Sequence, residues 1–125
     1  MRNTPTAAEW AVLCCLWEAE PQTLMQLAAR LHAREGWAKS TTTTMLRRMQ
    51  SKGLVRAEPN GRGTRFYANV RQDDARSSET ARFLSRVYQG SVGLMLSAMT
   101  SRQALSQAEI DELQAILQQA EERMK

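Results

Sequence analysis

Residues 38–53 read AKSTTTTMLRRMQSKG, and this stretch decides the fold. Threonine is a poor helix former because its branched side chain loses freedom against the preceding turn. The flanking residues nevertheless predict a helix over residues 40–51 that is ended by Gly53. A helical wheel predicts a buried stripe of Thr42, Met45, Leu46 and Met49, with the Thr42 hydroxyl bonded to a carbonyl one turn back.

The opposite side of that helix is polar and carries no acidic residue. It comprises Ser40, Thr41, Thr44, Arg47, Arg48 and Ser51. Short side chains let a helix backbone approach the bases in the major groove, and threonine offers a hydroxyl for base edges and a methyl for thymine. We predict that Thr41 and Thr44 contact bases and that Arg47 and Arg48 reach guanines or phosphates. The alternative is a solvated patch, although such a face usually mixes both signs of charge.

Two helices are predicted before this stretch. The capping-box spacing of Thr6 and Glu9 predicts a first helix that ends before Pro21, with Trp10, Leu13 and Trp17 on one face. Thr23 predicts the start of a second helix, which stops near Gly36. Its expected core residues are Leu24, Leu27, Ala28 and Leu31.

A hairpin is predicted after the helix over residues 40–51. Residues 54–58 and 64–70 are typical of strands around the turn sequence PNGRG at 59–63. Alternation predicts that Thr64, Phe66 and Ala68 point inward and that Arg65 and Tyr67 point outward. Arg62, at the tip, could reach a phosphate or a minor groove. Three helices followed by a basic hairpin are typical of a winged helix-turn-helix.

Charge is divided unevenly along the chain. Residues 1–71 hold 11 Lys or Arg and 5 acids, whereas residues 72–125 hold 6 and 8, consistent with the overall +4. Between residues 36 and 71 the only acid is Glu58, against eight basic residues. This pattern indicates a surface that binds a polyanion.

Composition narrows the class of protein. The chain has 125 residues, no apolar run long enough to span a bilayer and no signal-peptide pattern, so we expect a cytoplasmic protein without membrane contact. Cys14 and Cys15 are adjacent in a helical pattern, which favours small buried hydrophobic residues over a disulfide, redox or metal role. His32, the single histidine, has no partner at ligand or triad spacing. We expect no enzyme activity, catalytic residue, metal or cofactor.

The sequence resembles the penicillinase repressor family, which includes the BlaI, MecI and CopY regulators. The likeness lies in AEWAVLCCLWE, STTTTMLRRMQSKGLVRAE, GRGTRFYANV, FLSRVYQGSVGLMLSAM and LSQAEIDELQAIL, and it covers nearly the whole chain. The family's recognition pattern matches Trp37, Thr41, Thr44 and Arg48, and its tip Gly-Arg matches Gly61 and Arg62. The resemblance implies a dimeric repressor that binds a palindromic promoter operator and is released by a signal.

Three features of the sequence depart from the family's pattern. Many members carry Ser-Pro-Lys where this chain has Ala38, Lys39 and Ser40, which displaces the expected basic contact by one residue. The paired Cys-x-Cys motifs of copper-responsive members are absent, since no cysteine follows Cys15. The bond cleaved by a membrane protease in β-lactam-responsive members corresponds here to the bond between residues 98 and 99, Ala-Met. A regulatory protease is thus one candidate partner, and the inducing signal is left open.

The second half of the chain is expected to associate with a second copy. Two apolar helical segments flank Gly90, and Ser106 and Glu109 predict the start of a last helix with apolar residues at 3-4-3-4 spacing. Packing back onto the chain's own winged helix is the alternative, as is a ligand pocket in the methionine-rich interior. The expected dimer residues are Phe83, Val87, Leu94, Met95, Ile110, Leu113, Leu117 and Ala120.

The predicted organisation is therefore mainly α, with two domains. Residues 1–71 form a winged helix that binds double-stranded DNA, and residues 72–125 form a helical dimerisation region. The DNA contacts are expected from Lys39, Ser40, Thr41, Thr44, Arg47, Arg48, Arg62 and Arg65. The competing function is a basic protein-interaction module without sequence-specific DNA binding.

Overall fold

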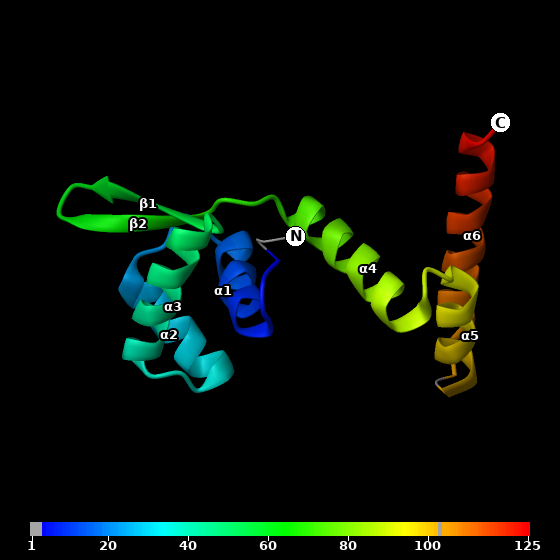
Figure 1. Cartoon of the computed structure of the whole chain (residues 1–125), viewed down its shortest axis with the longest axis horizontal. Helices are drawn as coiled ribbons and strands as arrows, with labels where there is room; N and C mark the ends of the chain where they lie inside the picture. The colour runs from blue at the N-terminus through cyan, green and yellow to red at the C-terminus, as the bar shows by residue number, and fades with distance from the viewer. Residues whose placement is uncertain (1–3, 103) are drawn as a thin grey trace. The chain divides into compact units, whose positions relative to one another are not determined.

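The computed structural model describes residues 4–102 and 104–125, and it has the predicted class of fold (Figure 1). Its elements are α1 (Ala7–Glu18), α2 (Leu24–Glu35), α3 (Lys39–Lys52), β1 (Val55–Asn60), β2 (Gly63–Ala68), α4 (Gln72–Tyr88), α5 (Val92–Arg102) and α6 (Gln107–Arg123). Three helices followed by an antiparallel hairpin make a winged helix. The chain forms two compact units, which divide within α4 between Glu79 and Thr80. The division after residue 71 into the two named domains stays a prediction, and residues 1–3 and 103 of those domains lie outside the described residues.

The first two helices begin where their predicted capping residues, Thr6 and Thr23, place them. The Thr6 Oγ1 accepts from the Glu9 backbone N–H at 3.1 Å, and the Glu9 carboxylate accepts from the Thr6 N–H at 2.9 Å. Thr23 and Gln26 repeat this exchange at the start of α2. Each pair satisfies two N–H groups that a helix start leaves without partners.

The core of the first unit lies where the three helices and the hairpin meet. Its buried apolar side chains are Val12, Leu13, Cys15, Leu16, Leu27, Ala28, Leu31, Met45, Leu46, Met49, Leu54, Val55 and Phe66. The buried faces predicted for α2 and α3 are confirmed, with Leu24 only half-buried at the margin.

The predicted inner face of α1 needs a correction. Trp10 and Trp17 are half-buried, in edge contact with ring centroids 5.4 Å apart. The Trp17 Nε1 donates to the Val70 carbonyl at 3.1 Å, and this bond keeps the polar end of the ring at the margin of the core. Glu9, Val12, Leu13 and Leu16, at helical spacing, take the inner face instead.

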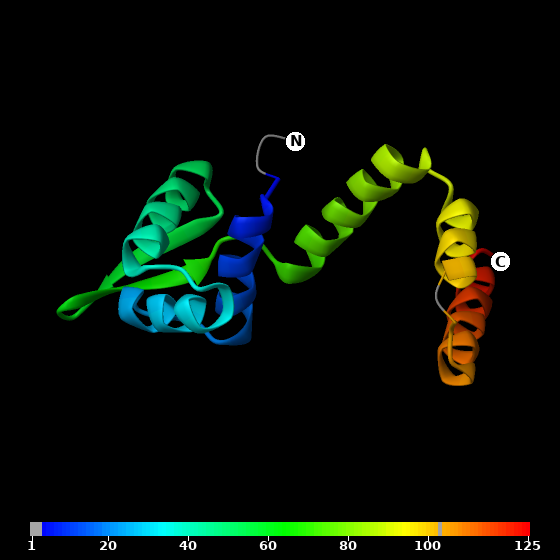
Figure 2. The ribbon, with the colours of Figure 1, turned by 90° about the horizontal axis from the view of Figure 1, so that it is seen from below.

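The hairpin differs from the prediction at its ends. Its register runs from Val55 opposite Ala68 to Asn60 opposite Gly63, and Gly61 adopts a φ of 62° in the turn. Phe66 is buried and Ala68 packs against the core, but Thr64 is exposed because the hairpin extends past the helices (Figures 1 and 2). The inward prediction for Thr64 was wrong.

Both cysteines of α1 are free, with Cys14 half-buried and Cys15 buried. Burial raises the pKa of the Cys15 thiol. Cys15 thus belongs to the apolar core, as the composition indicated.

The second unit contains the end of α4 together with α5 and α6. The start of α6 is confirmed: Ser106 and Glu109 form a capping box. No described residue from 80 to 125 is buried, and large apolar side chains are exposed on all three helices. These are Phe83, Val87, Val92, Leu94, Met99, Ile116 and Leu117, and Met124 just after α6 is exposed as well. Among the described residues, no helix has the length and apolar character needed to cross a membrane.

Candidate nucleic-acid interface

One side of α3 presents the predicted polar surface. Lys39, Ser40, Thr41, Thr44, Arg47, Arg48 and Ser51 are all exposed. The side chains of Thr42, Met45, Leu46 and Met49 fix this orientation because they are buried in the core. The helix therefore turns its acid-free side to solvent, as its periodicity predicted.

Thr42 is buried, but its predicted hydrogen bond is wrong. Its Oγ1 has no hydrogen-bond partner among the described residues. The bond to a carbonyl one turn back is made by the next residue, since the Thr43 hydroxyl donates to the Lys39 carbonyl at 3.1 Å. The Thr42 side chain thus belongs to the buried face of α3.

The N-terminus of α3 lacks the side-chain cap that α1, α2 and α6 possess. Its N-cap residue is Ala38, which offers no acceptor. N–H groups at the start of a helix favour an anion because they carry partial positive charge and lack intrahelical partners. Lys39 and Ser40 stand in this first turn, so the start of α3 combines donors with a positive charge.

Two of the basic residues in segment 36–71 are engaged with acids inside the protein. The Lys52 Nζ contacts both carboxylate oxygens of Glu9 at 2.9 Å, and the Arg56 Nε contacts Glu58 at 2.8 Å. In the described part of the chain the other six form no ion pair. These are Lys39, Arg47, Arg48, Arg62, Arg65 and Arg71. The only acid of the segment is thus neutralised, and the positive surface is concentrated on α3, the wing and Arg71.

Glu9 is an acidic residue buried in the core, which the sequence did not predict. Its side chain is only 1% exposed. Burial alone would raise the pKa of Glu9, but hydrogen bonds from Lys52 and Thr6 and the charge of Lys52 lower it overall. Local spacing predicts only a capping role for Glu9. Its partner, 43 residues away, has no signature in local spacing.

The wing carries the remaining predicted contacts. Gly61 and Arg62 are exposed at the tip, which projects beyond the helices in both views (Figures 1 and 2). Arg65 is half-buried on β2, opposite Glu58 in the register. The Arg56 guanidinium lies 4.1 Å from the centre of the Tyr67 ring on the same outer face.

A shallow hollow joins α3 to the wing. Its lining residues are Leu24, Thr43, Leu46, Arg47, Gln50 and Phe66. Arg47 thus lies on the side of α3 that faces β2. The predicted DNA contacts of the helix and those of the wing belong to neighbouring elements of one unit.

The eight predicted dimer residues all lie in the second unit. Phe83, Val87, Leu94 and Leu117 are exposed, with Leu117 at 58%. Met95, Ile110, Leu113 and Ala120 are half-buried. The described residues offer no cluster of three or more His, Cys, Asp or Glu that could hold a metal ion.

Comparisons with known proteins agree with one another. The family model for the penicillinase repressor matches residues 5–119. The methicillin resistance regulatory protein MecI of Staphylococcus aureus (strain N315) is 24% identical over 112 residues, which are 90% of this chain and 91% of MecI. The penicillinase repressor of Bacillus licheniformis is 28% identical over 118 residues, which are 94% and 92% of the two chains. The solution structure of the DNA-binding domain of the repressor BlaI matches with a TM-score of 0.53 at 23% identity, over 59% of this chain and 90% of that domain.

Proposed function

The chain belongs to the penicillinase repressor family, and on this premise we propose that it represses transcription by binding a palindromic operator as a homodimer. The observation that carries the proposal is the exposed, acid-free side of α3, which begins without a side-chain cap and lies beside a basic wing. A helix of this kind suits the major groove, where threonines and arginines read base edges. The wing arginines suit the phosphates alongside.

The proposed homodimer rests on the second unit. A helical segment with no buried residue has little to stabilise it by itself, because most helix stability comes from packing of an apolar face. Exposed Phe83, Leu94 and Leu117 would be covered by the same residues of a second copy in a two-fold interface. Two winged helices held by such an interface would meet two half-sites, which is the reason for proposing a palindrome.

Release of the repressor is proposed to act through this second unit. Severing or loosening the helices that hold two copies together would remove the gain from binding two half-sites at once. Proteolysis of the C-terminal region is one such route. The bond between Ala98 and Met99 lies within α5, so a protease would need local unfolding of that helix.

The test is to sequence the DNA fragments that the protein retains from its own genome and to titrate the enriched duplex against a scrambled one. A repressor should prefer the enriched duplex by a factor of at least about 1,000 and lose affinity steeply as salt rises. Equal binding to both duplexes would contradict the proposal. It would favour the competing function, a basic module that binds an acidic protein partner.

The proposed function needs no catalysis. The matched family is one of repressors, and the expected absence of enzyme activity, of a cofactor and of membrane contact stays a prediction. So does a cytoplasmic location, where an operator-binding protein would meet its DNA.

A further inference from the structure

The wing pairs with a third segment of the chain in addition to its two strands, β1 and β2. A two-stranded hairpin is marginally stable alone, and the outer edge of β2 is covered by the chain between α1 and α2. The Phe66 N–H donates to the Gln22 carbonyl at 2.8 Å, and the Gln22 N–H donates to the Phe66 carbonyl at 3.2 Å. The Ala68 N–H donates to the Glu20 carboxylate at 2.9 Å. Residues 20–22 therefore act as a short outer strand made partly from a side chain.

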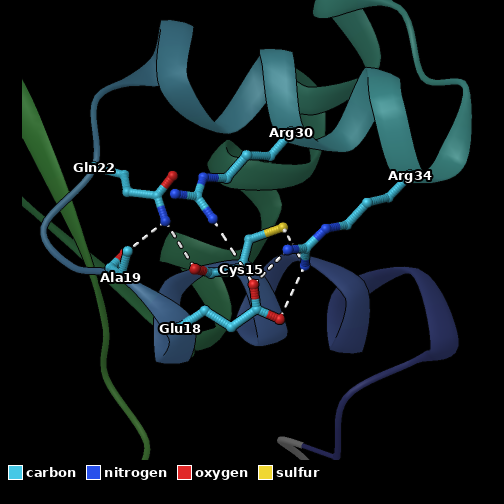
Figure 3. Close-up of polar contacts among 6 residues, drawn as sticks. All are labelled: Cys15, Glu18, Ala19, Gln22, Arg30 and Arg34. Carbon is cyan, nitrogen blue, oxygen red and sulfur yellow. Dashed lines mark hydrogen bonds and ion pairs between the residues drawn. The ribbon is translucent and has the colours of Figure 1, made fainter.

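This outer strand is fixed to α1 by a buried amide. Gln22 is 2% exposed, and its Nε2 donates to the carbonyls of Cys15 at 2.7 Å and Ala19 at 2.5 Å (Figure 3). Those carbonyls lie at the C-terminal end of α1, and the Cys15 carbonyl also accepts from the Ala19 N–H at 3.3 Å. The base of the wing is consequently attached to a rigid helix through Gln22.

The attachment matters because the wing is long compared with its base. Ala68 is six residues from Arg62, or about 20 Å of strand. A rotation of about 10° at the base would move the tip by about 3 Å over that length, which exceeds the tolerance of a hydrogen bond to phosphate. Small changes at Ala68 thus change what Arg62 can reach.

We propose that Glu20 is a positioning residue for DNA binding: its bond to the Ala68 N–H fixes the angle at which β2 presents Arg62 and Arg65. The proposal rests on the proposed function, since it assigns the wing to DNA. Glu20 is exposed and its carboxylate has this one hydrogen bond among the described residues, so a change there spares the core.

Two variants separate positioning from simple charge. An acid close to DNA repels phosphates, so removing its charge should strengthen binding if charge is its only role. Glu20→Gln removes the charge but keeps an oxygen that can accept from Ala68. Glu20→Ala removes both the charge and the acceptor. Positioning therefore predicts weaker binding for Glu20→Ala alone, whereas a pure charge effect predicts the same result for both variants.

The experiment titrates the full-length chain and both variants with the enriched duplex and with a scrambled duplex over a range of salt. We expect Glu20→Ala to bind both duplexes about two- to tenfold more weakly, with a salt slope shallower by about one. Glu20→Gln should bind as well as the parent chain or more tightly. Amide hydrogen exchange at Ala68 should be faster in Glu20→Ala alone, at an unchanged unfolding midpoint.

One outcome would overturn the proposal, and a different one would overturn the proposed function on which it rests. Equal or tighter binding by Glu20→Ala, with the same salt slope as Glu20→Gln, would leave Glu20 a surface acid. A parent chain that binds both duplexes strongly but equally would overturn the proposed repressor function, whereas the comparison of the two variants would still decide the role of Glu20.

Discussion

At the scale of single residues, a substitution at Thr44 distinguishes sequence-specific contacts to bases from non-specific binding to DNA. We expect Thr44→Ala to weaken binding to the enriched duplex by about 1–3 kcal/mol and to leave binding to a scrambled duplex nearly unchanged. The reason is that the exposed hydroxyl and methyl would contact a base edge, whereas arginines hold the phosphates. Titration with both duplexes measures this difference.

Thr43→Ala is the matched control for that variant. The Thr43 hydroxyl is occupied by the Lys39 carbonyl, and the side chain lies in the hollow beside the wing. Both substitutions raise helix propensity equally, and Thr43→Ala removes in addition only the bond to the Lys39 carbonyl. Equal losses on both duplexes for Thr44→Ala, or the same losses for Thr43→Ala, would remove Thr44 from base reading.

The ion pair between Glu9 and Lys52 predicts a stability effect without a direct DNA effect. Lys52→Met would leave a carboxylate buried without its charged partner, at a cost of about 2–4 kcal/mol in the free energy of unfolding. The lower part of the usual range applies because the Lys52 side chain is 31% exposed. Denaturant unfolding at neutral pH measures the loss. A variant as stable as the parent would show that Glu9 gains nothing from Lys52.

The same pair predicts a pH dependence with a definite sign. The pKa of Glu9 is lower in the folded protein than in the unfolded chain. The stabilisation that ionised Glu9 contributes to the folded protein is therefore fully present above the ordinary carboxyl pKa. This stabilisation is lost as the pH falls through the lowered pKa of Glu9. Glu9→Gln should flatten this part of the stability profile in mildly acidic to acidic solution. A profile that keeps the full acid-side loss would assign it to other carboxylates.

At the scale of elements, the wing is expected to supply affinity with little sequence preference. Arg62→Ala should weaken binding to both duplexes alike and lower the salt slope by about one, because one phosphate contact is lost. Arg30→Ala is a suitable control since that arginine belongs to α2 and lies 3.8 Å from Glu18 of α1. A loss confined to the enriched duplex would mean that Arg62 reads bases in a groove.

Elements with a local signal were predictable from the sequence. Thr6, Thr23 and Ser106 cap their helices through contacts three residues away, and the apolar period of α3 specifies which side is buried. The outer strand at Gln22 and the bond from Lys52 to Glu9 join residues more than 40 positions apart. Such contacts depend on how the elements pack, and a single sequence does not encode them as spacing.

The hairpin shows a second limit of prediction. Alternation correctly separated Phe66 from Arg65, since neighbours on a strand point to opposite faces. It failed at Thr64 because alternation gives the side of the sheet but not how far the core extends beneath it. Helical spacing had the same limit on α1, since it overestimated the burial of Trp10, which lies at the margin of the core.

At the scale of the whole molecule, the second unit differs from the first in how it can be stable. The winged helix buries 13 apolar side chains among the described residues, whereas residues 80–125 bury none. Exposed apolar residues on three successive helices are typical of a surface that another chain covers. The repressor activity proposed for α3 and the wing would thus depend on association through helices that do not touch DNA.

Leu117→Glu tests this dependence. Leu117 is 58% exposed on α6, and a glutamate there would place two like charges in the proposed two-fold interface, which disfavours the dimer by several kcal/mol. The winged helix should keep its fold because its core lies in the first unit. A single winged helix would then meet one half-site, and affinity for the full palindrome should fall by about 100-fold or more.

Sedimentation of Leu117→Glu measures whether the dimer is lost, and operator titration of the same samples measures whether affinity for the palindrome is lost. Gln119→Glu is the matched control because it adds the same charge to an exposed position on another side of α6. It should leave the dimer and the affinity unchanged. If Leu117→Glu stays dimeric at micromolar concentration, α6 is not the interface. If it becomes monomeric and still binds the palindrome as tightly as the parent chain, then association contributes nothing to operator binding, and release would have to act on α3 or the wing.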